Sequence, residues 1–285
     1  MHLRLADDRL LPLDRPYIMG ILNVTPDSFS DGGVDPSPAA AVARGLAMAR
    51  QGADLIDVGG ESTRPGAAAV GTEEQIRRVV DVIRGLTAGK AMASIDTQSP
   101  EVATAAVAAG AAMVNDVNAG RTPNMLETVA QLAVPIILMH MRGTPRTMQQ
   151  DPRYGDVVAE VREFLLGRAQ AAQAAGIARD RIILDPGIGF GKTCEHNLAL
   201  LMHLDQLVAT GYPILLGASR KRFLGSMLAD KDGNAPPPQA LVGATCATTA
   251  SGVANGVQFF RVHDAQANYQ AARVAWALRQ QGGPA

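Results

Sequence analysis

Short apolar runs alternate along the whole chain with longer, alanine-rich segments. Eight of these runs have the length of a buried strand and stop abruptly at polar or glycine residues. The runs give way to such positions at Asn23, Gly59, Asp96, Asn115, His140, Asp185, Ser219 and Arg261. Strand followed by helix, repeated, requires parallel strands, so eight such units predict a single (β/α)8 TIM barrel. Because the interior of that fold is packed solid, reactive side chains are expected at the C-terminal ends of its strands.

The alanine-rich segments carry signals for the start of helices. Ser37, Ser99 and Thr122 each place a capping hydroxyl before a proline, and Thr72 with Gln75 has the spacing of a capping box. We therefore expect helices to begin at these four places.

The N-terminal segment, residues 1–16, lies outside the eight units. Its leucines predict a short element that closes the floor of the barrel, and they are Leu3, Leu5, Leu10 and Leu13. No second domain is needed to account for the remaining sequence. Residues 1–285 are therefore expected to form one barrel domain.

Composition and charge narrow the function classes. The 285 residues are 47% hydrophobic and 4% aromatic, which is typical of one large α/β core. The net charge of −1 argues against nucleic acid as a partner, because such chains normally carry a clustered basic face. Two cysteines are too few for a disulfide framework, and neither a secretory signal nor a membrane span is found. These features predict a cytoplasmic protein that does not bind membranes.

Two loops after predicted strands have features of ligand-binding segments. Residues 23–33 are polar apart from Phe29 and end in a double glycine, which suits a mobile loop that closes over a ligand. Composition alone would make this loop a solvated connection. Residues 59–66 contain glycines that let backbone approach a ligand and place Arg64 beside Pro65, which is a moderate signal for phosphate.

A third loop, residues 187–193, resembles nucleotide-binding motifs but fails both of them. A Walker loop needs a further glycine near Pro186, and Lys192 stands where the dinucleotide motif needs its third glycine. We therefore interpret Lys192 as a surface charge. His140 and Arg142 have no partner in the pattern and are expected to be structural residues of the rim.

Polar groups of opposite character end different strands. Asp96, Asn115 and Asp185 follow three strands with no other charge beside them, so they suit a ligand with several N–H donors, such as an aminopyrimidinone ring. An ion pair within the rim is the structural alternative. Arg261 and His263 share one face of the last strand, and barrel strands seven and eight often carry a phosphate site. The basic run at residues 219–222 supports the same anion site, although such runs are usually solvated. Together these groups predict a substrate with a heterocycle and a phosphate group.

Two long motifs and several short ones resemble those of a known family. The long motifs span residues 19–33 and 57–66, and the short ones span residues 94–97, 115–116, 184–190, 217–221 and 261–264. They are similar to the motifs of bacterial dihydropteroate synthases. The resemblance covers essentially the whole chain, and its first two motifs are highly specific.

The resemblance implies a transferase of folate biosynthesis with a pterin-binding TIM barrel. Such enzymes condense 6-hydroxymethyl-7,8-dihydropterin pyrophosphate with 4-aminobenzoate and release 7,8-dihydropteroate and pyrophosphate. The family also implies Mg²⁺ as cofactor, a homodimer, small-molecule substrates as partners, and a target of sulfonamides.

The family's functional residues can be carried over position by position. The resemblance implies that the pterin ring is bound by Asp96, Asn115, Asp185 and Lys221. It implies that pyrophosphate with Mg²⁺ is held by Asn23, Arg261 and His263, of which Asn23 is the metal ligand. Around 4-aminobenzoate or the pterin it implies Thr63, Arg64, Pro65, Phe190, Ser219 and Lys221, with Phe29 and Asp31 on the closing loop.

The family's route implies that pyrophosphate leaves before the arylamine attacks, because a dihydropterin nitrogen can delocalise the cation left on the methylene carbon. Arg261, His263 and Mg²⁺ would stabilise the leaving group, and Asp185 the developing pterin charge. With Lys221 these residues form the expected catalytic set, and none is assigned as a general base. Arg222 stands where some members carry a small hydroxyl residue, so its cation could pair with the benzoate carboxylate.

Two alternative functions stay open from the sequence. A corrinoid-linked pterin methyltransferase shares the barrel and the pterin pocket, but it would not need the first loop or the anion site at Arg261 and His263. A pterin-binding paralogue without activity would be a binding protein, and the intact loops and anion site argue against it.

Overall fold

Eight parallel strands form the centre of the molecule, as the sequence predicts. The computed structural model describes residues 1–285 except 7, 26–36, 62–69, 145–146 and 282–285. The spatial order of the strands is β8–β7–β6–β5–β4–β3–β10–β9. A parallel bridge between Leu184 and Ile214 joins β8 to β9, so the sheet closes into a barrel. The strands are β3 (Tyr17–Asn23), β4 (Leu55–Gly59), β5 (Met92–Asp96), β6 (Met113–Asp116), β7 (Ile136–Met139), β8 (Ile182–Asp185), β9 (Leu215–Leu216) and β10 (Phe259–Val262).

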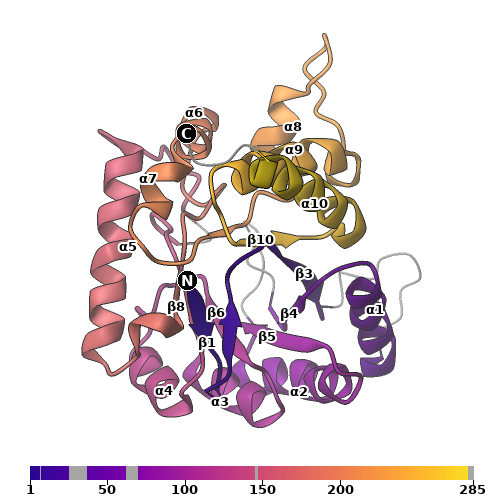
Figure 1. The fold of residues 1–285 in the computed structure, drawn as a ribbon, viewed down its shortest axis with the longest axis vertical. Coiled ribbons are helices and arrows are strands. Elements are labelled where there is room, and N and C mark those ends of the chain that lie inside the picture. The colour runs from indigo at the N-terminus through magenta and orange to yellow at the C-terminus, as the bar shows by residue number, and fades with distance from the viewer. Residues whose placement is uncertain (7, 26–36, 62–69, 145–146, 282–285) are drawn as a thin grey trace.

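The helices lie in a ring around the strands (Figure 1). They are α1 (Pro38–Arg50), α2 (Thr72–Ala88), α3 (Pro100–Ala108), α4 (Met125–Leu132), α5 (Val157–Ala174), α6 (Cys194–Met202), α7 (Leu204–Val208), α8 (Arg222–Met227), α9 (Val242–Ala254) and α10 (Ala265–Gln281), with 3-10 turns η2 (Arg179–Arg181) and η3 (Pro238–Leu241). Helices α9 and α10 pack side by side. Within the described ranges, no helix is both long and apolar enough to cross a membrane.

Two of the four predicted helix starts have the predicted cap. The hydroxyls of Ser37 and Ser99 accept backbone N–H bonds at the starts of α1 and α3. Helix α2 begins at Thr72, but no side chain caps it, because Gln75 instead donates to the carbonyl of Val70. The capping box is therefore wrong. Helix α4 begins at Met125, after the predicted place.

An antiparallel hairpin closes the floor of the barrel. It consists of β1 (His2–Arg4) and β2 (Leu10–Pro12), and Figure 1 shows β1 lying across the strands. Leu3 and Leu5 are buried in the cluster that fills the lower barrel, and Leu13 packs against it. Leu10 was also expected there, but its side chain points to solvent and is 52% exposed. Leu11 packs against the floor in its place, because neighbouring strand residues face opposite sides.

The barrel interior is divided into two levels. The lower level is one apolar cluster, to which the strands contribute Tyr17, Met19, Leu55, Met113, Ile137, Ile183, Leu215 and Phe259. Two or four residues further along the same strands come the inward positions of the upper level, which include Asn23, Asp57, Ser94, Asp96, Asn115, Asp185, Gly217 and Arg261. The intervening positions face the helices and build the larger core. Period-two alternation therefore carries polar groups into the barrel only at its C-terminal end.

Candidate active site

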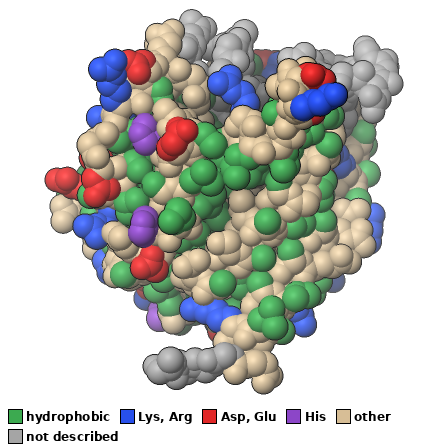
Figure 2. Space-filling view, turned by 90° about the horizontal axis from the view of Figure 1, so that it is seen from above, with side chains coloured by type: hydrophobic (Ala, Val, Ile, Leu, Met, Phe, Trp, Pro, Cys, Tyr) green, Lys and Arg blue, Asp and Glu red, His purple; other side chains and the backbone are tan. Residues whose placement is uncertain are grey.

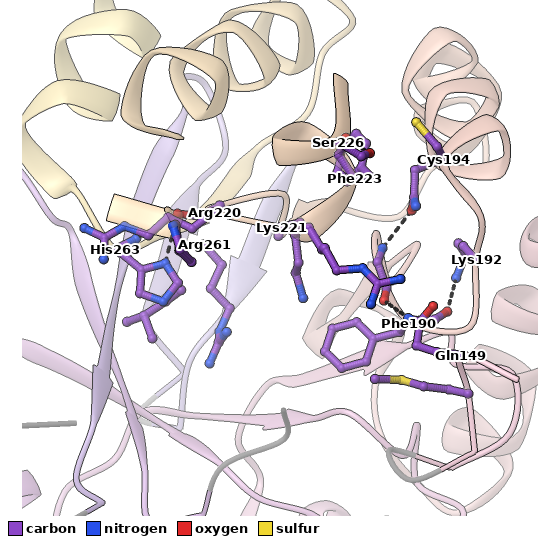
Figure 3. Close-up of a pocket in the computed structure, with 18 of the residues that line it drawn as sticks. Gln149, Phe190, Lys192, Cys194, Arg220, Lys221, Phe223, Ser226, Arg261 and His263 are labelled. Carbon is purple, nitrogen blue, oxygen red and sulfur yellow. Dashed lines mark hydrogen bonds between the residues drawn. The ribbon is translucent and has the colours of Figure 1, made fainter. Parts of the chain in front are cut away.

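A cavity of about 750 Å³ opens at the C-terminal ends of the strands. The predicted site residues that line it are Asn23, Asp96, Phe190, Ser219, Lys221, Arg261 and His263. Figure 3 shows Arg261 and His263 on one side, Phe190 on the other, and Lys221 between them. Segments far apart in the sequence therefore meet at one hollow, as the barrel prediction requires.

A network of buried polar groups forms the inner wall of this hollow. Asp57 accepts hydrogen bonds from Ser94 Oγ at 2.6 Å, Asn115 Nδ2 at 2.9 Å and Arg261 Nε at 2.6 Å. Arg261 Nη2 also donates to Asp96 at 2.6 Å. The guanidinium thus bridges carboxylates on β4 and β5. The rim ion pair that the sequence left open is present at Asp96, and burial still raises the pKa of this carboxyl to about 7 against the opposing effect of Arg261.

Asp57 is a functional residue that the sequence analysis missed. Its side chain is fully buried and holds Arg261 and Asn115 in place. The signal was present, because Asp57 is the one charged residue in the apolar run of β4. It lies two positions before the end of its strand, whereas the candidates were sought only at strand ends.

Asp185 ends β8 beside the cavity without an ion pair among the described residues. Its Oδ1 accepts the N–H of Gly187 at 2.7 Å, and burial raises the pKa of this carboxyl to about 6. Gly217 lines the cavity, and a Cβ built there would lie 3.8 Å from Asp185 Oδ2. The second oxygen of Asp185 therefore lies close to a glycine that lines the cavity. Asn115, like Asp185, is buried behind the lining rather than within it.

Lys221 and Phe190 both line the cavity and contact each other. The Lys221 ammonium lies 3.9 Å from the centre of the Phe190 ring, which is a cation–π contact. Burial, together with the nearby Arg261, lowers the pKa of Lys221 to about 8. Arg222, the next residue, is exposed at the start of α8 and also lines the cavity. A second cation is thus available near the cavity mouth.

Hydrogen bonds join the segments that follow β9 and β10, at the side of the cavity where the sequence predicts an anion site, called the anion end below. Ser219 Oγ accepts the backbone N–H of His263 at 3.1 Å and lies 3.0 Å from His263 Nδ1. Since the hydroxyl oxygen accepts from the amide, its proton can be donated to Nδ1, which leaves the imidazole proton on Nε2. Arg220 forms a two-bond ion pair with Asp264 at 2.6 and 3.0 Å and ties the two strand ends together. The position of the His263 ring is thereby fixed relative to Ser219.

Lys192 is not the surface charge that the sequence suggested. Its side chain is buried, with 3% of the residue exposed, and its ammonium contacts His140 Nδ1. The prediction is wrong because the ammonium's partners are two carbonyl groups of its own loop and His140, the residue that follows β7, and no nucleotide motif reports such contacts. His140 is a buried residue of the rim, as predicted.

Comparison with known proteins places the chain in a family. The sequence profile of the family described as "Pterin binding enzyme" matches residues 19–263. The dihydropteroate synthase of Mycobacterium leprae is 48% identical over 91% of this chain and 92% of its own length. That of Escherichia coli strain K12 is 43% identical over 95% of both chains. The chain belongs to the dihydropteroate synthase family.

Solved structures of dihydropteroate synthases have the same fold. The enzyme of Xanthomonas albilineans with 4-aminobenzoic acid has a TM-score of 0.90 and 48% identity, covering 99% of both chains. The Yersinia pestis enzyme in a sulfonamide drug complex has a TM-score of 0.91 and 41% identity, covering 98% of this chain and 100% of that one. These similarities favour the synthase over the methyltransferase and the inactive paralogue that the sequence left open.

Several residues that the dihydropteroate synthase resemblance implies lie outside the described residues. They are Phe29, Asp31, Thr63, Arg64 and Pro65. The structure brings the other predicted residues together, but Arg261 has different partners from those expected. Arg261 was expected to serve the anion with His263, whereas its Nε and Nη2 are bonded to Asp57 and Asp96. Arg261 therefore links the carboxylate end of the site to the anion end.

The residues present fit a magnesium ion that is held mainly by its phosphate ligands. In the described part of the chain, no group of three or more His, Cys, Asp or Glu side chains could hold a metal. Asn23 offers one amide oxygen to the cavity. Mg²⁺ usually keeps several waters and takes one or two protein oxygens besides substrate phosphates, so this donor set suits it.

Proposed function

We propose that this chain is the synthase that condenses 6-hydroxymethyl-7,8-dihydropterin pyrophosphate with 4-aminobenzoate to give 7,8-dihydropteroate and pyrophosphate. The observation that carries the proposal is one cavity with buried carboxylates at its inner wall and oriented cationic or N–H donors at its β9–β10 side. The family membership of the chain and the 4-aminobenzoic acid bound to a relative support the same reaction.

The inner wall would bind the pterin ring. Asp185 has one carboxylate oxygen engaged by Gly187, which leaves the second for a ring N–H or amino donor. Asp96 and Asn115 extend the polar wall, and Lys221 also lines the cavity. As positive charge develops on the pterin, the buried carboxylate of Asp185 would stabilise it, because the charge interaction is stronger where water is excluded.

The opposite end would bind pyrophosphate as the leaving group. His263 would donate from Nε2, and Arg261 would contribute positive charge behind it. Asn23 would supply the protein oxygen for Mg²⁺, and the bound ion would neutralise charge that builds up on the departing phosphate. The chain thus acts mainly by stabilising a leaving group, so a strong base is not required.

The arylamine would enter from the mouth of the cavity. A neutral arylamine is already a nucleophile, and we assign no general base. Phe190 and Lys221 would flank 4-aminobenzoate, with Ser219 nearby and Arg222 within the lining of the mouth. We further propose that Phe29, Asp31, Thr63, Arg64 and Pro65 contribute from the two loops, as the family resemblance implies.

The decisive experiment measures pyrophosphate release with and without 4-aminobenzoate. We expect release that depends on both substrates and on Mg²⁺, together with formation of dihydropteroate. Release of pyrophosphate that ignores 4-aminobenzoate, or binding of the pterin without turnover, would contradict the proposal.

We also propose a homodimer in the cytoplasm. Figure 2 looks onto the face that bears α6 to α10 and shows hydrophobic side chains gathered in its middle. The exposed apolar residues of these helices and their ends are Met202, Met227, Leu228, Val274 and Leu278. Apolar patches of this kind are typical of protein interfaces, and a self-complementary patch suits a twofold dimer. Light scattering of the native chain and of a Val274→Glu, Leu278→Glu variant tests this. A native mass of one chain would contradict the dimer, and a variant that is still dimeric would contradict this interface.

A further inference from the structure

The loop that follows β8 is folded around a buried lysine. Its three glycines, at positions 187, 189 and 191, all have positive φ, at 65°, 81° and 62°. A Cβ on Gly187 would lie 1.8 Å from the carbonyl oxygen of His140, and one on Gly191 would lie 2.6 Å from that of Arg142. Glycine is therefore required at both places, because no other residue fits the space or the backbone conformation. This tight fold turns loop carbonyl groups inward.

The ammonium of Lys192 occupies the centre of that fold. Its Nζ donates to the carbonyl oxygens of Gly187 at 2.9 Å and Phe190 at 3.0 Å, and it lies 2.9 Å from His140 Nδ1. An ammonium has three donors, so these three neutral partners use all of them. Burial lowers the pKa of His140 to about 2, which keeps its imidazole neutral and able to accept at Nδ1. Burial also lowers the pKa of Lys192, to about 7.

Both peptide groups held by Lys192 belong to residues that orient the site. Gly187, whose carbonyl oxygen accepts from Lys192, donates its own N–H to Asp185 Oδ1 at 2.7 Å. Phe190, whose carbonyl oxygen is the second acceptor, presents its ring to the Lys221 ammonium at 3.9 Å. Figure 3 shows Lys192 beside the backbone of Phe190, on the side away from Lys221. One ammonium thus fixes the backbone next to a pterin-binding carboxylate and next to the cavity's aromatic wall.

We propose that Lys192 is a positioning residue of this synthase, which sets the orientation of Asp185 and Phe190 through the carbonyl groups of Gly187 and Phe190. The proposal rests on the proposed function of the site. Lys192 has no role in the chemistry itself, because its three donors are already used within the protein. Its effect should therefore fall on the pterin and arylamine parts of the cavity and spare the anion end at His263.

The loop has other anchors, so removal of the ammonium should shift it rather than unfold it. Gln149 Nε2 donates to the carbonyl oxygen of Gly189 at 2.8 Å, and Asn197 Oδ1 accepts its N–H at 2.7 Å. The Tyr154 hydroxyl donates to the carbonyl oxygen of Gly191 at 2.7 Å. These bonds surround the loop on three sides and do not involve Lys192. They make a test by substitution possible.

The test compares Lys192→Met with Lys231→Met, an exposed lysine in the loop after α8, in the full-length protein. Calorimetry measures the binding of an oxidised pterin and of pyrophosphate with Mg²⁺ separately, and a steady-state assay gives KM and kcat. For Lys192→Met we expect pterin affinity to fall about 10- to 100-fold, the range expected when a hydrogen bond to a charged group is weakened or lost. Pyrophosphate affinity should stay within about twofold, and Lys231→Met should match the native protein. Equal losses for both ligands, or native pterin binding, would overturn the proposal.

A second pair of variants tests the same contact if Lys192→Met does not fold. His140→Asn keeps an acceptor near the place of Nδ1, whereas His140→Leu removes it. We expect His140→Leu to weaken pterin binding several-fold more than His140→Asn, and equal effects would overturn the proposal. The binding measurements do not depend on turnover. A native chain that binds the pterin but makes no dihydropteroate would therefore refute the proposed function, whereas the comparison of pterin affinities would still test the role of Lys192.

Discussion

The lower and upper levels of the barrel interior are built from the same strands and have opposite properties. On β4, Leu55 belongs to the apolar floor cluster, and Asp57, two residues later, accepts three hydrogen bonds from side chains on β5, β6 and β10. The same change occurs on β10 between Phe259 and Arg261. Stability and function are therefore separated along the barrel axis by two residues.

The difference shows that burial of the polar groups in the upper level is unfavourable, because their charged forms are better solvated by water. Apolar burial in the lower level stabilises the fold by roughly 1.5 to 3 kcal/mol per large side chain. In the upper level, burial raises the pKa of Asp96 to about 7 and that of Asp185 to about 6. A raised pKa means that the charged form is disfavoured in the folded protein. The buried carboxyl groups of the site therefore lower the free energy of unfolding, and apolar burial in the floor offsets that loss.

The largest expected effect comes from opening the floor. Leu3→Ala should lower the free energy of unfolding by about 2 to 5 kcal/mol, because Leu3 is fully buried in the hairpin that closes the barrel. Leu10→Ala on the same hairpin is the matched control, and its 52% exposed side chain predicts a change within about 0.5 kcal/mol. Denaturant unfolding measures both. Similar losses for the two variants would show that the hairpin does not plug the barrel.

A substitution in the upper level should lower activity and leave stability unchanged. Asp185→Asn should lower kcat/KM about 100-fold, a typical cost of losing a group that stabilises developing charge, because the amide places a donor where the pterin also presents donors. Its unfolding free energy should not fall, since a buried charge is removed. Asp230→Asn, on an exposed loop, controls for the substitution itself. Near-native turnover by a folded Asp185→Asn protein would refute the pterin assignment.

The pH dependence of stability and of binding should run in opposite directions. Burial raises the pKa of Asp185 from 3.8 to about 6, so between these values the folded chain holds a proton that the unfolded chain has released. The contribution of this group to the free energy of unfolding should therefore fall by roughly 2 to 3 kcal/mol as pH rises through the window. Pterin binding needs the carboxylate and should strengthen over the same window. The difference between native and Asp185→Asn unfolding curves from pH 4 to 7 isolates the effect, and parallel curves would contradict it.

A smaller effect should separate the two ends of the upper level. His263→Ala should weaken pyrophosphate binding about tenfold, which corresponds to one hydrogen bond to a charged group, and leave oxidised pterin binding unchanged. Arg261→Ala should weaken both ligands, because it also leaves Asp57 and Asp96 without their cation. Calorimetry with each ligand distinguishes the variants. A pterin loss in His263→Ala as large as the pyrophosphate loss would mean that the ends are not separate.

The smallest effect is expected at the cavity mouth. Arg222 is exposed, so a pairing of its guanidinium with a benzoate carboxylate should contribute no more than about 1 kcal/mol. Arg222→Ser should accordingly raise the KM for 4-aminobenzoate by less than about fivefold and leave the KM for the pterin substrate unchanged. The rise should shrink at high salt because the pair is screened. A KM that ignores the substitution would show that Arg222 does not reach the substrate.

Sequence reasoning succeeded where a local pattern carries the information. Eight apolar runs that end abruptly in polar or glycine residues predicted the strands, the barrel and the rim that holds Asp96, Asn115 and Asp185. It failed at Asp57 and Lys192, whose significance lies in their partners. Asp57 meets Arg261, which is 204 residues away in the sequence, and Lys192 meets His140, 52 residues away. No local signal reports such distances.

The sequence by itself determined which side chains face the barrel interior and at what height, because strand geometry alternates side chains regardless of what they later contact. Tertiary structure decided which polar groups pair with one another across the barrel. Arg261 lies on β10 and His263 directly follows that strand, yet Arg261 is bound by two carboxylates while His263 contacts Ser219. Such pairings depend on distances of about 3 Å across the closed barrel, and those distances exist only after all eight strands have come together.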